Sequence, residues 1–331
     1  MNKTGYGHEM ILAVSSLKLP HTHYRGRFAP SPTGPLHAGS LASALGSWLD
    51  ARSNHGTWLV RIEDLDAPRC ITGMDQRILA QLQACGLIWD EEVMWQSQQL
   101  KAYQNALETL YCDRQIYPCN CSRQQISGAL SAQGLLRARN QEQVYPGTCR
   151  NGHVWQAQPP KDMSASAWRL ALDSDQWICF TDAEFGPQEQ NLNVDVGDFV
   201  LRRADGIVAY QLAVVVDDAR QGITHIVRGA DLLSNTARQI YLQGVLDCPT
   251  PQYRHLPLVL DPHGEKLSKQ TQATEINTAS NAAVLQALQA AALHLGLRGL
   301  SDGLDQTVAA WLLQATYAWT DRTKELSRTS S

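Results

Sequence analysis

Segments with the character of buried strands alternate with helical segments along most of this chain. The run 57–62 (TWLVRI) is typical of a buried strand, and apolar residues at helical spacing flank it at 38–53 and 75–85. The other members of the series are strands predicted at 24–28, 223–227 and 255–260, and helices predicted from Ser97, at 210–216 and from Ser234. Strands that alternate with helices in this way predict an α/β fold with a parallel sheet.

The alternation weakens in two regions, which divide the 331 residues into five segments. Residues 117–204 show loops and short strands, so we expect an insertion between two halves of one sheet-containing domain. Two helical patterns, at 281–295 and 307–319, precede a polar tail. The predicted segments are a disordered extension at 1–23, the two halves of the domain at 24–116 and 205–270, the insertion at 117–204, and a short helical C-terminal region at 271–331.

Composition argues against two classes of protein, the polycationic nucleic-acid binders and the membrane proteins. The 28 basic and 32 acidic side chains give a formal net charge of −4, so a nucleic acid would have to be met by a local basic surface. No run of about 18 apolar residues is present, which argues against a transmembrane helix. The apolar stretch 10–14 is too short for the core of a secretory signal peptide. We therefore expect a cytoplasmic protein with no membrane partner.

Chemically active side chains cluster just after the predicted strands. In an open α/β sheet, ligands bind beyond the carboxyl ends of the strands. The residues found there are Arg27 and His37 after the first strand, Glu63, Asp64 and Asp66 after the second, Arg228 and Asp231 after the third, and Lys266 and Lys269 after the last. We expect these arginines, carboxylates, histidine and lysines to converge on one site.

Two of these segments have the character of phosphate-binding elements. A proline-stiffened loop ends at a helix that begins with His37, Ala38, Gly39 and Ser40, where small side chains let a nucleotide approach the helix N-terminus. Lys266 and Lys269 suit a loop that closes over a polyphosphate. Taken singly, the first could be a tight turn packed on the sheet and the second a solvated surface run.

These motifs occur together and in order, and in combination they resemble the class I aminoacyl-tRNA synthetases. The segment RFAPSPTGPLHAGS (27–40) resembles their HIGH signature in the form used by glutamyl and glutaminyl enzymes, and KLSKQ (266–270) resembles their KMSKS loop. Three further matches to the glutamyl branch are RIEDLD (61–66), AYQLAVVVDD (209–218) and IVRGAD (226–231). The resemblance covers about residues 24–270. It implies a Rossmann-type parallel sheet and an ATP-dependent ligase.

The resemblance implies how the nucleotide would be held. His37, Gly39, Ser40 and Lys269 would bind ATP, and magnesium would accompany it. His37, Lys266 and Lys269 would be the catalytic residues, with Lys269 the foremost lysine. The sequence departs from the general motifs at Ser40, where the second histidine is expected, and at Leu267 and Gln270 in the lysine loop.

The resemblance also implies that L-glutamate is the amino acid. Glutamate carries two carboxylates and one ammonium, so its site should offer two cations and one carboxylate. Arg27, Arg228 and Glu63 fit that requirement. The resemblance adds Ser31 near the amino group and Tyr210 near the side-chain carboxylate, and it makes Arg27 the bidentate partner that prefers glutamate to glutamine.

Three of the eight cysteines, at 119, 121 and 149, are spaced as metal ligands. The run CNC at 119–121 with YPGTCR at 145–150 is similar to the zinc site of short paralogues of the glutamyl enzymes. One structural zinc would then be held by Cys119, Cys121, Cys149 and, by the resemblance, Tyr145. Plain ligand chemistry favours His153 as the fourth ligand instead. Three free thiols without metal are the alternative.

The number of residues after the lysine loop bears on which molecule is expected to accept the glutamate. Only 61 residues follow position 270, too few for the helical anticodon-binding region of full-length glutamyl enzymes. The short paralogues instead attach glutamate to the queuosine base of aspartate tRNA, so the expected partners are L-glutamate, ATP and the tRNA(Asp) anticodon stem-loop. Two competing hypotheses are a truncated glutamyl-tRNA synthetase that charges the 3′ end of tRNA(Glu) and a non-catalytic RNA-binding module.

Overall fold

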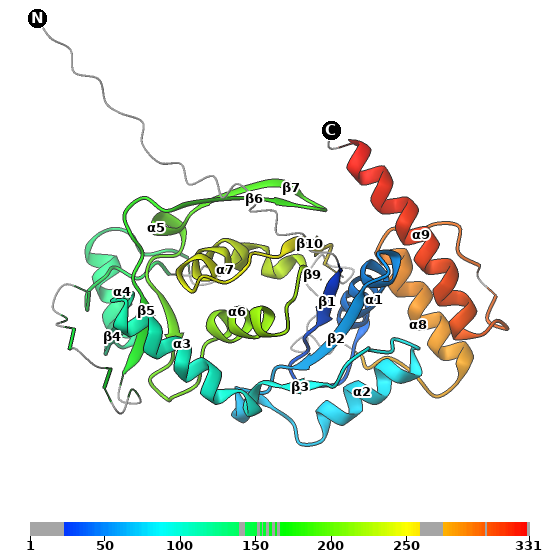
Figure 1. Ribbon diagram of the computed structural model, residues 1–331, viewed down its shortest axis with the longest axis horizontal. Helices are drawn as coiled ribbons and strands as arrows, with labels where there is room; N and C mark the ends of the chain where they lie inside the picture. The colour runs from blue at the N-terminus through cyan, green and yellow to red at the C-terminus, as the bar shows by residue number, and fades with distance from the viewer. Residues whose placement is uncertain are drawn as a thin grey trace, which may run out of the picture.

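The computed structural model describes residues 23–138, 143–150, 153, 155, 156, 159, 160, 163, 166–258, 274–301 and 303–329. At one end of its long axis lie the strands β4 (Ile116–Cys119) and β5 (Ala167–Leu170), and at the other lie the helices α8 (Asn281–His294) and α9 (Val308–Thr329) (Figure 1). The extension predicted at 1–23 lies outside the described residues, except for His23. In the described part of the chain, no helix is both long and apolar enough for a membrane span.

The centre of the molecule is a parallel sheet in two groups of strands. One group contains β1 (Arg25–Phe28), β2 (Thr57–Ile62) and β3 (Met94–Trp95), and the other pairs β9 (His225–Gly229) with β10 (Gln252–Leu256). The groups meet at β1 and β9, because the backbone N–H of Thr224 donates to the carbonyl of Arg25 at 2.9 Å. The prediction of an α/β fold with a parallel sheet is confirmed.

Helix α1 (Ala38–Ser53) packs between this sheet and the helices α8 and α9 (Figure 1). Because both of its sides are covered, its buried residues are not confined to one stripe and include Leu41, Leu45 and Leu49. Gly46 permits the close approach to β10, since a Cβ atom there would lie 2.7 Å from Leu256 Cδ1. The other helices of the domain are α2 (Met74–Ala84), α3 (Leu100–Cys112), α6 (Tyr210–Arg220) and α7 (Leu233–Val245).

The segment 117–204 is built from antiparallel strands, in contrast to the sheet that flanks it. Strand β5 pairs with β4 on one side and with β8 (Phe199–Arg202) on the other, and α4 (Arg123–Ala132) follows β4. The hairpin of β6 (Trp177–Asp182) and β7 (Gly186–Asn191) precedes the short helix α5 (Leu192–Asp195). This hairpin joins the parallel sheet, because Asp182 of β6 pairs with Tyr253 of β10.

Several predicted boundaries differ from the structure. Ser97 does not cap the third helix, which begins at Leu100; Ser97 instead lies in a 3-10 turn, and both its N–H and its hydroxyl donate to Asp64. The strand predicted at 223–227 lies at His225–Gly229, so Arg228 is inside the strand and does not follow it. The strand predicted at 255–260 begins at Gln252, and residues 259 and 260 lie outside the described residues. The predicted polar tail continues α9 to Thr329.

Trp319 of α9 joins the C-terminal helix to the start of the sheet. Its ring is fully buried, and Nε1 donates to Asp50 Oδ1 at 2.9 Å. The other carboxylate oxygen of Asp50 accepts from the hydroxyl of Tyr24 at 2.6 Å. One buried carboxylate on α1 therefore ties together segments from the two ends of the described chain.

Replacing Trp319 by alanine should lower the free energy of unfolding by about 3–5 kcal/mol, because a large buried ring is lost. Tyr317→Ala on the same helix is the matched control: Tyr317 is 65% exposed, and its loss should cost no more than about 0.5 kcal/mol. Urea unfolding followed by circular dichroism measures both. Equal midpoints for the two variants would contradict this packing of α9.

Candidate active site

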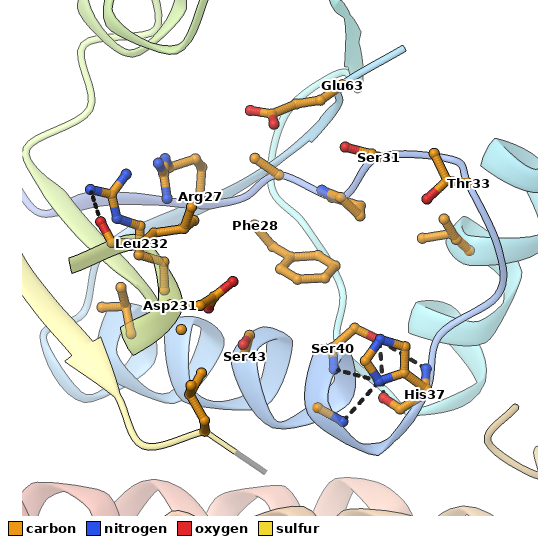
Figure 2. A pocket seen from close by; sticks show the side chains of 18 of the residues that line it. Arg27, Phe28, Ser31, Thr33, His37, Ser40, Ser43, Glu63, Asp231 and Leu232 are labelled. Atoms are coloured by element: carbon orange, nitrogen blue, oxygen red, sulfur yellow. Dashed lines mark hydrogen bonds between the residues drawn. The ribbon is translucent and has the colours of Figure 1, made fainter. Parts of the chain in front are cut away.

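A cavity of about 780 Å³ opens at the carboxyl ends of the parallel strands (Figure 2). Every described residue that the sequence assigned to ATP or glutamate lines it: Arg27, Ser31, His37, Gly39, Ser40, Glu63, Tyr210 and Arg228. Lys266 and Lys269 lie outside the described residues. Of the three carboxylates expected after β2, only Glu63 lines the cavity, since Asp64 is bonded to Ser97 and Asp66 to Arg69.

His37 forms the N-cap of α1 at the edge of the cavity. Its Nδ1 accepts from the backbone N–H groups of Gly39 at 3.1 Å and Ser40 at 3.4 Å, and Ser40 Oγ accepts from the N–H of His37 at 2.8 Å (Figure 2). Because Nδ1 is an acceptor, a neutral ring carries its proton on Nε2. The ring thus brings an N–H donor to a helix N-terminus, where an anion is favoured.

A buried network of charges supports one wall of the cavity. Arg27 holds Asp218 with two hydrogen bonds, from Nε at 3.0 Å and from Nη2 at 3.3 Å. Arg61 donates to the same carboxylate at 2.7 Å and to Glu63 at 3.3 Å. Asp217 completes the network, with Arg61 Nε at 3.9 Å. These ion pairs therefore fix the positions of Arg27 on β1 and Arg61 on β2 relative to helix α6.

The carboxylates of this network differ in acidity because their partners differ. Burial opposes ionisation of Asp218, but Arg27 and Arg61 outweigh it and hold the pKa of Asp218 below its ordinary value. Burial raises the pKa of Glu63 and that of Asp217 despite the neighbouring Arg61. Asp218 is thus the fixed anion of the network.

Sequence reasoning did not single out Arg61, Asp217 and Asp218. The sequence did contain a signal for them. Arg61 lies inside a buried strand, and Asp217 and Asp218 lie inside an apolar helix, so each needs a buried partner of opposite charge.

Arg228 is a buried cation with a different environment. Its side chain lines the cavity and is buried, yet none of the described groups that accept its hydrogen bonds carries a negative charge. The acceptors are His255 Nε2 at 3.1 Å, the Tyr210 hydroxyl at 3.4 Å, Gln239 Oε1 at 2.8 Å, Thr236 Oγ1 at 2.8 Å and the Leu232 carbonyl at 3.4 Å. Within the described chain, then, Arg228 lacks an anionic partner.

Figure 2 shows Glu63 and Ser31 above Phe28 and His37 below it, with Asp231 beside the Phe28 ring. The backbone N–H of Glu63 donates to the carbonyl of Pro30 at 3.0 Å, which ties the loop after β1 to the end of β2. Among the described residues, the cavity is lined by three guanidinium groups, Arg27, Arg69 and Arg228, and by two carboxylates, Glu63 and Asp231. Arg69 is paired with Asp66. The other two arginines and the carboxylates can bind a molecule that carries both carboxylates and an ammonium group.

A separate cluster of sulfur ligands lies in the segment 117–204. The Sγ atoms of Cys119, Cys121 and Cys149 lie within 4.8 Å of one another. The Tyr145 hydroxyl is 3.4 Å from Cys119 Sγ and 3.5 Å from Cys121 Sγ. Burial opposes ionisation of Cys149, but hydrogen bonds from Tyr145 and from the Asn120 backbone lower its pKa to about 7. The ring of His153 packs instead against Trp155 at 4.8 Å and is not among the clustered ligand atoms.

The comparisons with known proteins agree with this geometry. Residues 23–325 match the family model for the catalytic domain of class I tRNA synthetases (E and Q). Two relatives named glutamyl-Q tRNA(Asp) synthetase are 52% identical over 303 residues, in Albidiferax ferrireducens, and 54% identical over 301 residues, in Burkholderia cenocepacia. The chain belongs to the glutamyl-Q tRNA(Asp) synthetase family. The alignments cover 87% and 90% of this chain and 97% of each relative.

Two solved structures of glutamate–tRNA synthetases are similar to this chain. A glutamate tRNA ligase from Elizabethkingia meningosepticum, in complex with its amino acid, aligns with a TM-score of 0.63 and 29% identity over 75% of this chain and 52% of that one. A glutamate-tRNA synthetase from Elizabethkingia anophelis aligns with a TM-score of 0.62 and 30% identity over 75% and 53%. This chain thus spans about half the length of those two proteins. The family resemblance drawn from the sequence is confirmed.

The buried His255, which accepts a hydrogen bond from Arg228, makes the stability of the fold sensitive to acid. Burial lowers the pKa of His255, so the stability that depends on its neutral form is present above its unfolded value of about 6.5 and is lost as pH falls toward the folded value. The free energy of unfolding of the unmodified chain should therefore fall between about pH 7.5 and about pH 5.5. His255→Gln has no titrating ring and should lose less over this range. Urea unfolding at each pH measures this loss. If the free energy of unfolding falls equally in both proteins, the acid sensitivity does not come from His255.

Proposed function

We propose that this chain activates L-glutamate with ATP, without needing tRNA, and transfers the glutamyl group to the queuosine base in the anticodon of tRNA(Asp). The observation that carries this proposal is Arg228, a buried cation at the cavity whose described partners are all uncharged. Such a cation is stabilised when an anion completes its surroundings. The names of the family members support glutamate as the amino acid and tRNA(Asp) as the acceptor.

The charges of the cavity suit glutamate better than glutamine. The bidentate role that the resemblance implies for Arg27 conflicts with its two hydrogen bonds to Asp218, which occupy Nε and Nη2. In this proposal, Arg228 and the Nη1 group of Arg27, from which no described residue accepts, hold the two carboxylates. Glu63 and Ser31 take the ammonium group, and Tyr210, which contacts Arg228, lies beside the side-chain carboxylate. A glutamine side chain would leave one buried guanidinium without an anion, which disfavours its binding.

Activation joins the α-carboxylate of glutamate to the α-phosphorus of ATP and breaks the bond to pyrophosphate. The reaction needs no protein nucleophile, so positioning and charge stabilisation provide the catalysis. His37 and the N-terminus of α1 contact the phosphates in this proposal, beside Gly39 and Ser40. Lys269, with Lys266, neutralises charge on the transferring group, and magnesium accompanies the ATP.

Glutamate should support ATP–pyrophosphate exchange in the absence of tRNA, and glutamine should not. Arg27→Ala should reduce kcat/KM for glutamate by about a hundredfold or more, because it removes one partner of a buried charge pair. Arg52→Ala, which breaks a surface ion pair with Asp90 at the far end of α1, should change it by no more than about fivefold. Exchange that requires tRNA, or that proceeds equally with glutamine, would contradict this prediction.

The acceptor follows from the similar chemistry of two diols. Queuosine carries a cyclopentene diol whose hydroxyl pair resembles the 2′,3′ pair of a terminal ribose, so one geometry of acyl transfer serves either. We propose that the segment 117–204 binds the anticodon stem-loop. Recognition of such a loop rests on splayed bases and backbone shape.

Labelled glutamate should enter tRNA(Asp) that carries queuosine and should not enter tRNA(Asp) from cells unable to make queuosine. Removal of the 3′-terminal adenosine, which takes away the ribose diol at that end, should leave incorporation intact, because the acceptor diol is in the anticodon. Equal incorporation into both tRNAs, or loss after removal of the terminal adenosine, would favour a glutamyl-tRNA synthetase that charges the terminal ribose.

One structural zinc is proposed for the cluster of Cys119, Cys121, Tyr145 and Cys149. Three thiol groups and one hydroxyl converge within the distances of a tetrahedral site. The thiolate form, which is the one that binds metal, is favoured at Cys149 by its lowered pKa. The cluster belongs to the antiparallel segment and not to the cavity, so a structural role is proposed.

Protein purified without chelator should contain about one zinc per chain, and Cys121→Ser should lose most of it, because removing one of four ligands weakens a structural site severely. Cys112→Ser is the matched control, since Cys112 is exposed and outside the cluster. Elemental analysis that finds under about 0.2 equivalents in the unmodified protein, or no difference between the two variants, would contradict the zinc site.

A further inference from the structure

His255 is a fully buried histidine that connects a carboxylate to the guanidinium of Arg228. Its Nδ1 lies 2.6 Å from Asp182 Oδ2, and Arg228 Nε donates to its Nε2 at 3.1 Å. Neither His255 nor Asp182 lines the cavity. Any effect of this pair on a bound molecule must therefore pass through Arg228.

The hydrogen bonds allow one arrangement of protons. The Nε of arginine is always a donor, so His255 Nε2 must be an acceptor, and the proton of the neutral ring lies on Nδ1 and points to Asp182. Asp182 is itself fixed, because its Oδ1 accepts from the N–H groups of Glu184 and Phe185, each at 3.0 Å. A carboxylate that receives the proton of one ring nitrogen fixes the tautomer and strengthens the other nitrogen as an acceptor.

The surroundings of His255 favour its neutral form. Besides Asp182 and Arg228, it faces the ring of Tyr253, stacked at 6.2 Å, and the hydroxyl of Thr236 at 3.1 Å, with Asp231 further off. Burial and the nearby Arg228 lower its pKa, while Asp182 and Asp231 oppose them. A protonated ring would set one N–H against another, which would push the Arg228 guanidinium out of place.

We propose that His255, oriented by Asp182, is a positioning residue that sets the plane of the Arg228 guanidinium for recognition of a carboxylate of the bound amino acid. This inference rests on the proposed function, because it requires that Arg228 meet glutamate. The pair joins β6 of the hairpin, through β10, to β9 of the parallel sheet. The hairpin thereby contributes to the amino-acid site without reaching it.

Three variants separate positioning from general stability. The Asp182→Asn variant presents an amide N–H to Nδ1 of His255, so the ring proton moves to Nε2. That proton then faces the Nε–H group of Arg228, and the hydrogen bond between the two residues is lost. His255→Asn retains a donor for Asp182 but removes the acceptor for Arg228. Each should raise the KM for glutamate at least about tenfold, equivalent to about 1.4 kcal/mol, with the KM for ATP unchanged. His255→Gln restores an acceptor at the position of Nε2 and should stay within about threefold of the unmodified enzyme.

Tyr253→Phe is the matched control, because it removes a buried hydrogen bond to Gln243 in the same layer and keeps the ring that Arg228 faces. It should lower Tm and leave the KM for glutamate unchanged. If the Asn and Gln variants of His255 behave alike, or if Tm falls without a change in KM, His255 is only structural and the proposal is wrong. If the unmodified enzyme shows no glutamate-dependent exchange, the proposed function fails and this inference fails with it.

A measurement that does not depend on activity checks the proton arrangement. Nitrogen-15 NMR of the histidine rings at about pH 7.5, with His255 assigned by its absence in His255→Gln, should show a neutral ring protonated on Nδ1. Asp182→Asn should convert it to the Nε2 form. A ring protonated on Nε2 in the unmodified protein would overturn the proposal even if glutamate exchange is normal.

Discussion

The Asp218 carboxylate accepts hydrogen bonds from two buried guanidinium groups, Arg27 on β1 and Arg61 on β2. Removing these charges from water is costly, and only their mutual pairing offsets the cost. Because Asp218 belongs to α6, the pairing fixes two strands and one helix at the edge where the cavity opens. The positions of Glu63 and Tyr210 depend on this arrangement, since Glu63 follows directly on β2 and Tyr210 begins α6.

Two kinds of cation therefore coexist in one cavity. Arg27 is held by an internal anion before any ligand arrives, so its position is preorganised. Arg228 is held by neutral groups, so its position is fixed while its charge remains available to a ligand. An amino acid with a charged side chain satisfies this second cation, and an uncharged side chain does not. In the proposed function, selectivity for glutamate is thus a consequence of which guanidinium the fold leaves without a carboxylate.

The local sequence pattern was sufficient to predict helices and strands that are determined mainly by residues close together in the chain. The bounds of α1 and β2 agree with the sequence pattern, and Arg27, Glu63 and Arg228 meet at one cavity because parallel strands end at one edge. Long-range pairings were not predictable, because nothing near Asp182 indicates that it pairs with His255, 73 residues away. The same holds for Arg27 and Asp218, 191 residues apart. The Ser97 cap failed because Asp64 competes for the same hydroxyl.

A crystal structure of the glutamate complex tests the central claim most directly. We expect the side-chain carboxylate of glutamate against the Arg228 guanidinium and Tyr210, and the ammonium group against Glu63. Arg27 should keep both of its hydrogen bonds to Asp218, and Arg228 should keep those to His255 and Gln239. A complex in which Arg27 leaves Asp218 to reach the ligand, or in which glutamate binds away from Arg228, would contradict a preorganised cavity with one uncompensated cation.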